Sequence, residues 1–104
     1  MAITFKEFQS KAEQVDVHPE HTDQPWVYAL TGLASESAKL SETLTTELPK
    51  GELTIEGRKK ATDSAWQLLW FLTAACRYAG ISLEEAAEHG LVELDKIGDD
   101  FLPR

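Results

Sequence analysis

Two histidines have a spacing that is typical of metal ligands. His18 and His21 are three residues apart, and Asp16 and Asp23 stand close to them in the chain. On a helix this spacing would bring both imidazoles to one face, as a zinc site requires. Both histidines lie instead in a polar stretch with two prolines, and no third strong ligand accompanies them. We therefore interpret residues 16–25 as a solvated loop rather than a metal site.

His89 and Cys76 are the other residues that could take part in acid–base or nucleophilic chemistry. The sequence places no nucleophile in a defined relation to His89, and no base stands beside Cys76 in its apolar surroundings. A single cysteine excludes an internal disulfide and is typical of a reducing compartment. The first residues contain no apolar signal segment, so we expect a cytoplasmic protein.

The elements that would position these side chains are all predicted to be helices. Apolar residues recur every three or four positions, and no segment alternates between apolar and polar residues as a strand would. Capping-box spacings at Thr4 and Ser82, a cap at Thr54 and a terminating glycine at Gly80 mark helix ends. We expect helices over residues 4–15, 26–48, 54–79 and 82–97, with 99–104 as a short tail. Leu83, Ala87, Leu91, Leu94 and Ile97 should face inward from the last helix.

Composition and patterning together predict a single domain, residues 1–104, that folds as an all-α, antiparallel four-helix bundle. The third helix is apolar on nearly every side after Ala65, which is more apolar surface than one small chain can cover. We therefore expect the chain to associate with copies of itself, as a homodimer or a homotetramer. The formal net charge of −8 argues against nucleic-acid and membrane partners, because phosphate groups would be repelled.

Two segments of the sequence resemble the signatures of a known enzyme family. Residues 28–42 (YALTGLASESAKLSE) and 66–86 (WQLLWFLTAACRYAGISLEEA) are similar to the first and second signatures of MazG-like nucleoside triphosphate pyrophosphohydrolases. The start of the chain, with Thr4-Phe5 and Phe8-Gln9 before a proline-containing loop, is also similar to that family. The resemblance covers nearly the whole chain in order.

This resemblance implies an all-α enzyme that works as a dimer or tetramer and cleaves nucleoside triphosphates to monophosphate and pyrophosphate. The family binds Mg²⁺ through Glu-x-x-Glu on one helix and Glu-x-x-Asp on the next. Such a motif suits the metal because Mg²⁺ prefers hard oxygen ligands and bridges carboxylates to phosphates. Residues at i and i+3 share a helix face, so two antiparallel helices can direct four carboxylates to one point. The bound metal then activates a water.

Three of the four expected carboxylates are replaced in this sequence. The motif falls on Glu36, which is retained, and on Lys39, Ser64 and Gln67, which are not carboxylates. The replacements change the formal charge of the site from about −4 to about zero, which removes the repulsion that a metal would otherwise offset. The resemblance therefore predicts a hydrolytically weak or inactive protein, in which Mg²⁺ is expected from the family but not from the residues.

Two other uses of these positions stay open. Asp63, which neighbours Ser64, could form a shifted one-metal site with Glu36 and Gln67, and the chain would then be an active pyrophosphohydrolase. Alternatively, Lys39, Ser64 and Gln67 could donate hydrogen bonds to a nucleotide or another anion without a metal. The positions could also form a vestigial pocket filled by water and a Glu36–Lys39 pair. A further hypothesis for the function is an oligomeric scaffold, in which the interface between copies is itself the function.

Aromatic residues could contribute to a nucleotide site or to packing. Trp26, Trp66 and Trp70 recur among the predicted helices, and aromatic residues at helical spacing usually pack in a core. We assign Trp70 to the core and treat Trp66, beside Gln67, as the candidate for stacking on a nucleobase.

Overall fold

Four α-helices and one short 3₁₀ helix make up the described part of the chain. The computed structural model describes residues 3–15 and 24–101, and within these ranges it contains no strand. The elements are α1 (Phe5–Gln14), α2 (Pro25–Glu47), η1 (Leu48–Lys50), α3 (Ile55–Tyr78) and α4 (Leu83–Phe101). The expectation of an all-α fold is therefore confirmed for these residues. None of the described helices is long and apolar enough to cross a membrane.

Helix beginnings follow the capping signals in the sequence. The Thr4 hydroxyl accepts a hydrogen bond of 3.1 Å from the Glu7 amide at the start of α1. The Thr54 hydroxyl accepts one of 2.9 Å from the Gly57 amide at the start of α3. Each bond satisfies an amide that has no partner within the first turn of its helix, so the polar cap residue fixes where the helix begins.

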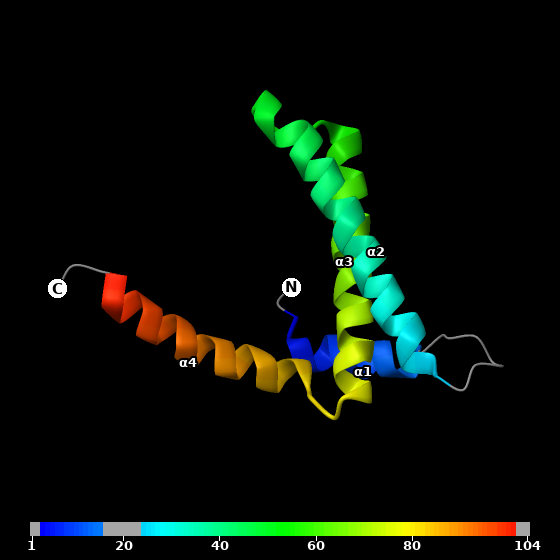
Figure 1. Ribbon diagram of the computed structural model, residues 1–104, viewed down its shortest axis with the longest axis vertical. Helices are drawn as coiled ribbons and strands as arrows, with labels where there is room; N and C mark the ends of the chain where they lie inside the picture. The colour runs from blue at the N-terminus through cyan, green and yellow to red at the C-terminus, as the bar shows by residue number, and fades with distance from the viewer. Residues whose placement is uncertain (1–2, 16–23, 102–104) are drawn as a thin grey trace.

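The central unit of the fold is an antiparallel hairpin formed by α2 and α3 (Figure 1). The Phe71 ring packs against the α-carbon of Gly32, where no other residue would leave room for it. Tyr28 meets the same ring edge-on, with 5.8 Å between the ring centroids. At the other end of the hairpin, the Glu47 side chain lies over the backbone of Gly57 and bonds to Thr54. These contacts fix the register of the two helices.

The third and fourth helices meet at a sharp turn. Gly80 has a φ of 76°, a left-handed conformation that glycine adopts without steric cost. The Leu83 amide, at the start of α4, donates a hydrogen bond to the Gln9 side chain of α1. After this turn α4 contacts α1 and then diverges from the hairpin, so that the two arms form an open angle with the beginning of α1 between them (Figure 1).

Two expectations for the last helix differ from the structure. The helix continues to Phe101, so Asp99 belongs to α4 and not to a tail. Leu83 is buried as expected, but Leu91, Leu94 and Ile97 are exposed in the single chain. The reason is tertiary, because α4 follows the Gly80 turn away from the hairpin and has no described helix beside its second half.

The interior of the single chain contains small side chains. Its buried apolar residues are four alanines and Leu83, and no large side chain among the described residues is fully buried. The radius of gyration is 16.6 Å, whereas a compact chain of this length has about 13 Å. Small residues let α1, α2 and α3 approach closely, while many large apolar groups stay at the surface.

Candidate functional site

The hairpin register brings Glu36, Lys39, Ser64 and Gln67, the positions to which the resemblance assigns the metal motif, to the same part of the molecule. Gly32 of α2 contacts Phe71 of α3, and both helices rise about 1.5 Å per residue. Because the helices are antiparallel, Glu36, four residues after Gly32, lies level with Gln67, four residues before Phe71. Three more residues put Lys39 level with Ser64. Counting from the Glu47–Gly57 contact gives the same pairs to within one residue. The two halves of the motif therefore face each other across the middle of the hairpin.

Glu36 is the buried charged residue of this site. Only 6% of its surface is exposed, whereas the other glutamates of α2 lie closer to solvent. Its carboxylate oxygen Oε1 accepts a hydrogen bond of 3.3 Å from Lys39 Nζ, one turn further along the same helix. The lysine reaches the carboxylate from solvent, since its own side chain is exposed. The carboxylate is thus paired with an ammonium group at the point where the motif would place a metal.

The α3 side of the site carries polar groups without charge. Ser64 is buried, and Gln67 is half-buried. The Gln67 amide nitrogen donates a hydrogen bond of 3.3 Å to the backbone carbonyl of Asp63, so the amide group turns back towards its own helix. Asp63 itself is exposed. Asp63 directly precedes Ser64, so its side chain is rotated by about 100° around the helix from that of Ser64.

This donor set does not suit a divalent cation of the Mg²⁺ type. A magnesium site needs several hard oxygen donors in near-octahedral geometry, and here the facing positions supply one carboxylate with an ammonium group 3.3 Å away. Within residues 3–15 and 24–101, no three His, Cys, Asp or Glu side chains gather as a metal site. What the arrangement offers is a row of hydrogen-bond donors, namely Lys39, Ser64 and Gln67.

Trp66 lies apart from these positions. It stacks on Trp70 with 5.8 Å between ring centroids and 19° between the ring planes. Both indoles line an apolar cavity of about 220 Å³ with Phe8, Lys11, Ala12 and Val15, which places them on the side of α3 that packs against α1. Trp66 and Ser64 are two residues apart and so point to nearly opposite sides of α3. In one chain, Trp66 therefore does not meet the Glu36 site.

A polar cavity away from the Glu36 site was not predicted from the sequence. It measures about 290 Å³ and lies where α1, the end of α3 and the Gly80 turn meet. Arg77 lines it, and its guanidinium group also lies 5.2 Å from the centroid of the Tyr78 ring. The sequence feature that could have indicated this cavity is Arg77, a charged residue inside an otherwise apolar stretch. The remaining residues that line this cavity are Gln9, Glu13, Thr73, Gly80, Ile81, Ser82 and Glu85.

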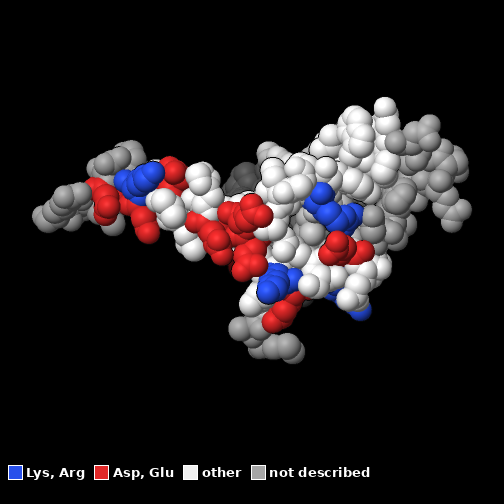
Figure 2. All heavy atoms as spheres, turned by 90° about the horizontal axis from the view of Figure 1, so that it is seen from below, with Lys and Arg blue, Asp and Glu red and all other residues white. Residues whose placement is uncertain are grey.

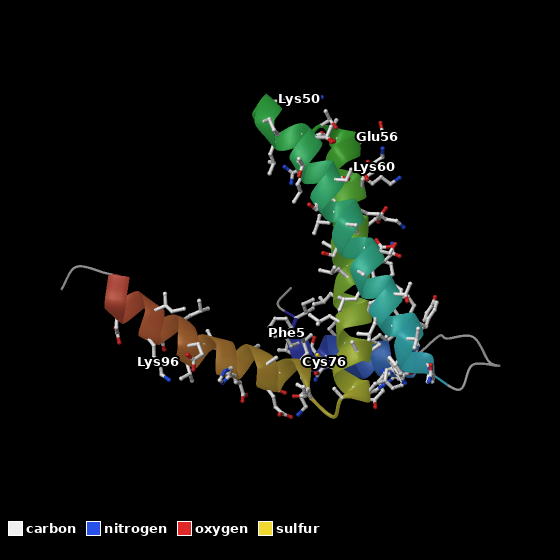
Figure 3. All side chains as sticks on the ribbon, in the orientation of Figure 1. Phe5, Lys50, Glu56, Lys60, Cys76 and Lys96 are labelled. Carbon is white, nitrogen blue, oxygen red and sulfur yellow. The ribbon has the colours of Figure 1, made fainter. Side chains whose placement is uncertain are left out.

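Three further candidates can be placed more briefly. His18 and His21 lie outside the described residues. His89 is an exposed residue of α4. Cys76 is a free, half-buried thiol at the base of α3 (Figure 3).

Comparison of the chain with protein-family models, with curated proteins and with solved structures found no match. The functional argument therefore depends on the residues and on their geometry.

Proposed function

We propose that this chain is a MazG-like protein in which an internal ion pair has replaced the metal-dependent hydrolytic site, leaving a site that binds a nucleotide or another anion without cleaving it. The observation that carries this proposal is the buried Glu36 carboxylate, 3.3 Å from Lys39 Nζ in the middle of the α2–α3 hairpin. The family motif places its carboxylates at these facing positions, so the resemblance and the hairpin register point to the same part of the molecule.

The physical argument concerns charge. Four carboxylates directed to one point repel each other unless cations lie between them. A lysine in one of these positions supplies a positive charge that is covalently part of the chain. The exposed end of Lys39, with the Ser64 hydroxyl and the Gln67 amide, can donate hydrogen bonds to an anion. None of these three side chains can ligate Mg²⁺ as a carboxylate does.

The most direct test restores the motif. The variant Lys39→Glu, Ser64→Glu, Gln67→Asp should gain a site for Mg²⁺ or Mn²⁺, because it returns three carboxylates to positions facing Glu36. We expect its melting temperature to rise with millimolar Mn²⁺, by linkage of binding to folding, while the unchanged protein shows no such rise. Circular dichroism checks that the variant is folded. The double variant Lys39→Glu, Gln67→Asp avoids a change at the buried Ser64 and still provides three carboxylates with Glu36.

A matched control makes the same kinds of change at exposed positions. Lys59→Glu, Ser41→Glu and Gln14→Asp alter the net charge equally at exposed positions. Ser41 is two residues from Lys39 and so points to nearly the opposite side of α2. This control should not respond to Mn²⁺. If neither restored variant responded, or if the control responded equally, the assignment of the motif to these positions would be wrong.

The unchanged protein is tested with a panel of ribo- and deoxynucleoside triphosphates, with and without Mg²⁺. The proposal predicts no pyrophosphate release above a heat-treated control, and a melting temperature that rises with nucleotide in the absence of metal. Pyrophosphate release that is lost in Glu36→Ala would instead support the active enzyme with a rearranged site. No thermal response to any nucleotide would refute the binding site.

A further inference from the structure

The polar cavity at the Gly80 turn is lined by pairs of polar side chains that share a helix face. Gln9 and Glu13 are four residues apart and so lie one turn apart on the same side of α1. Thr73 and Arg77 have the same spacing on α3. A third pair comes from the first turn of α4 and the residue that caps it. Three elements therefore direct polar groups into one space of about 290 Å³.

Backbone amides hold two of these side chains in position. The Gln9 side-chain oxygen accepts a hydrogen bond from the Leu83 amide at the start of α4. The Ser82 hydroxyl oxygen accepts one of 2.9 Å from the Glu85 amide, which begins the same helix. Both side chains are thus oriented by the fold itself, and a ligand does not have to order them on binding.

The hydrogen-bond donors of the cavity suit a carboxylate. Because the Gln9 oxygen already accepts a bond, the amide nitrogen of this side chain supplies donors, and the Ser82 hydroxyl likewise keeps its O–H as a donor. Arg77 lines the same cavity, and its Nη2 atom is buried. A guanidinium group has five N–H donors, so it can hold several partners at once, and carboxylates are the partners that its geometry fits best.

Two carboxylates add acceptors at the rim. Glu13 and Glu85 are exposed and approach the cavity from α1 and α4, whereas Thr73 is 5% exposed and forms its floor. The lining therefore has one guanidinium group against two carboxylates. In Figure 2, which shows this end of the fold from below, acidic side chains gather over α4 and basic side chains lie on the same face. The cavity thus presents charges of both signs to a ligand.

This mixture of charges selects a zwitterion. A phosphate group would be repelled by both carboxylates, and a simple amine would be repelled by the guanidinium group. An α-amino acid carries a carboxylate and an ammonium group on one carbon, so each finds its counterpart here. The volume of about 290 Å³ lies near the lower end of the roughly 300–1,000 Å³ that small-molecule pockets have. Ile81, which also lines the cavity, offers an apolar contact to the side chain of the ligand.

We propose that this cavity binds a free α-amino acid. The carboxylate of the ligand accepts hydrogen bonds from Arg77, Gln9 and Ser82. Its ammonium group lies between Glu13 and Glu85 at the rim. The bound amino acid would join α1, the end of α3 and the beginning of α4, so it would stabilise the turn at which α4 leaves the hairpin.

The inference is independent of the proposed function. Arg77 is ten residues after Gln67 on α3, which is about 15 Å along the helix axis. None of the residues that line the cavity belongs to the motif positions. A nucleotide response that depends on Lys39 and an amino-acid response that depends on Arg77 can therefore be measured separately in one protein.

The first experiment measures the melting temperature of the full-length protein with each standard L-amino acid at millimolar concentration. At least one of them should raise it, because a ligand that binds the folded state stabilises that state. Isothermal titration calorimetry then compares this amino acid with its α-amide, which lacks the carboxylate, and with its N-acetyl derivative, which lacks the ammonium group. Each derivative should bind about tenfold more weakly or worse, since it leaves charged groups of the cavity without their partner.

Matched variants assign the response to the cavity. Arg77→Gln and Glu85→Gln should each weaken binding of the amino acid about tenfold, whereas Arg58→Gln and Glu42→Gln make the same changes of charge at exposed positions outside the cavity and should not. Circular dichroism checks that Arg77→Gln is folded. If it is not, Glu85→Gln decides, because this side chain is exposed.

Three results would overturn the proposal. The first is that no amino acid raises the melting temperature or gives heat of binding. The second is that the α-amide or the N-acetyl derivative binds as tightly as the amino acid, since the cavity would then not recognise a zwitterion. The third is that Arg58→Gln or Glu42→Gln weakens binding as strongly as the two cavity variants.

Discussion

At the scale of single residues, Glu47 joins the end of α2 to the beginning of α3. Its carboxylate oxygen Oε1 accepts hydrogen bonds of 2.7 Å from the Thr54 amide and 2.7 Å from the Thr54 hydroxyl. The hydrogen bond from the Thr54 backbone amide lowers the pKa of Glu47 below its ordinary value of 4.5, and the hydrogen bond from the Thr54 hydroxyl adds to this effect. Thr54 in turn caps α3, so a carboxylate positions the residue that begins the helix.

The lowered pKa of Glu47 predicts how stability depends on pH. A carboxylate with a lowered folded-state pKa stabilises the protein above pH 4.5, and this contribution is lost as the pH falls through the lowered pKa. Glu47→Gln removes the charge and keeps the oxygen acceptor, so it should unfold at a lower urea concentration at neutral pH. The difference between the two proteins should shrink on acidification. Glu42→Gln, the same change of charge elsewhere on α2, serves as the control, and an equal pH dependence for both variants would contradict the assignment.

At the motif positions Glu36, Lys39, Ser64 and Gln67, the sequence indicates the chemistry of the side chains but not how deeply they are buried. From the sequence alone, the resemblance implies that Lys39, Ser64 and Gln67 stand where the MazG-like family has carboxylates. The pairing of Glu36 with Lys39 follows from their spacing on a helix, but the burial of Glu36 does not, because burial depends on the helix packed against it.

At the scale of elements, the α2–α3 hairpin depends on a close approach at Gly32. The Phe71 ring occupies the space where a β-carbon would lie, and this ring also contacts the rings of Tyr28 and Trp70, each with 5.8 Å between ring centroids. A ring packed against several groups has little freedom to move, so the contact sets both the distance and the register of the two helices.

Gly32→Ala should therefore destabilise the protein although alanine favours helices. We expect overpacking to cost about 1–3 kcal/mol, against a gain of about 1 kcal/mol in helix propensity. Urea unfolding measures the net loss. Ser41→Ala, at an exposed position of the same helix, should change stability by less than about 0.5 kcal/mol. A Gly32→Ala protein as stable as the unchanged one would show that Phe71 does not pack there.

At the scale of the whole molecule, the chain is more open than its length requires. A radius of gyration of 16.6 Å and an interior of small side chains leave α4 joined to the remainder mainly through α1. A fold in which the large apolar residues lie outside the interior of one chain gains its main hydrophobic stabilisation on association. The self-association that the sequence predicts would supply this stabilisation.

Thermal unfolding should consequently depend on protein concentration. For an obligate dimer of this size, the melting temperature should rise by about 3 °C for each tenfold increase in concentration, because unfolding then also separates the copies. Differential scanning calorimetry over a hundredfold range of concentration measures the shift. A constant melting temperature over this range would contradict an obligate dimer.

The sequence by itself determined the helices, because helix formation follows local signals. Spacing of apolar residues, the Thr4 and Thr54 caps and the Gly80 turn predicted their number and most of their ends to within one or two residues. It also predicted more apolar surface than one chain covers. Only the tertiary structure decided that α4 turns away from the hairpin, that Glu36 is buried and that Trp66 lies on the side of α3 that packs against α1. These features depend on contacts between residues far apart in the chain, and the pattern within a helix shows which face is apolar but not what will cover it.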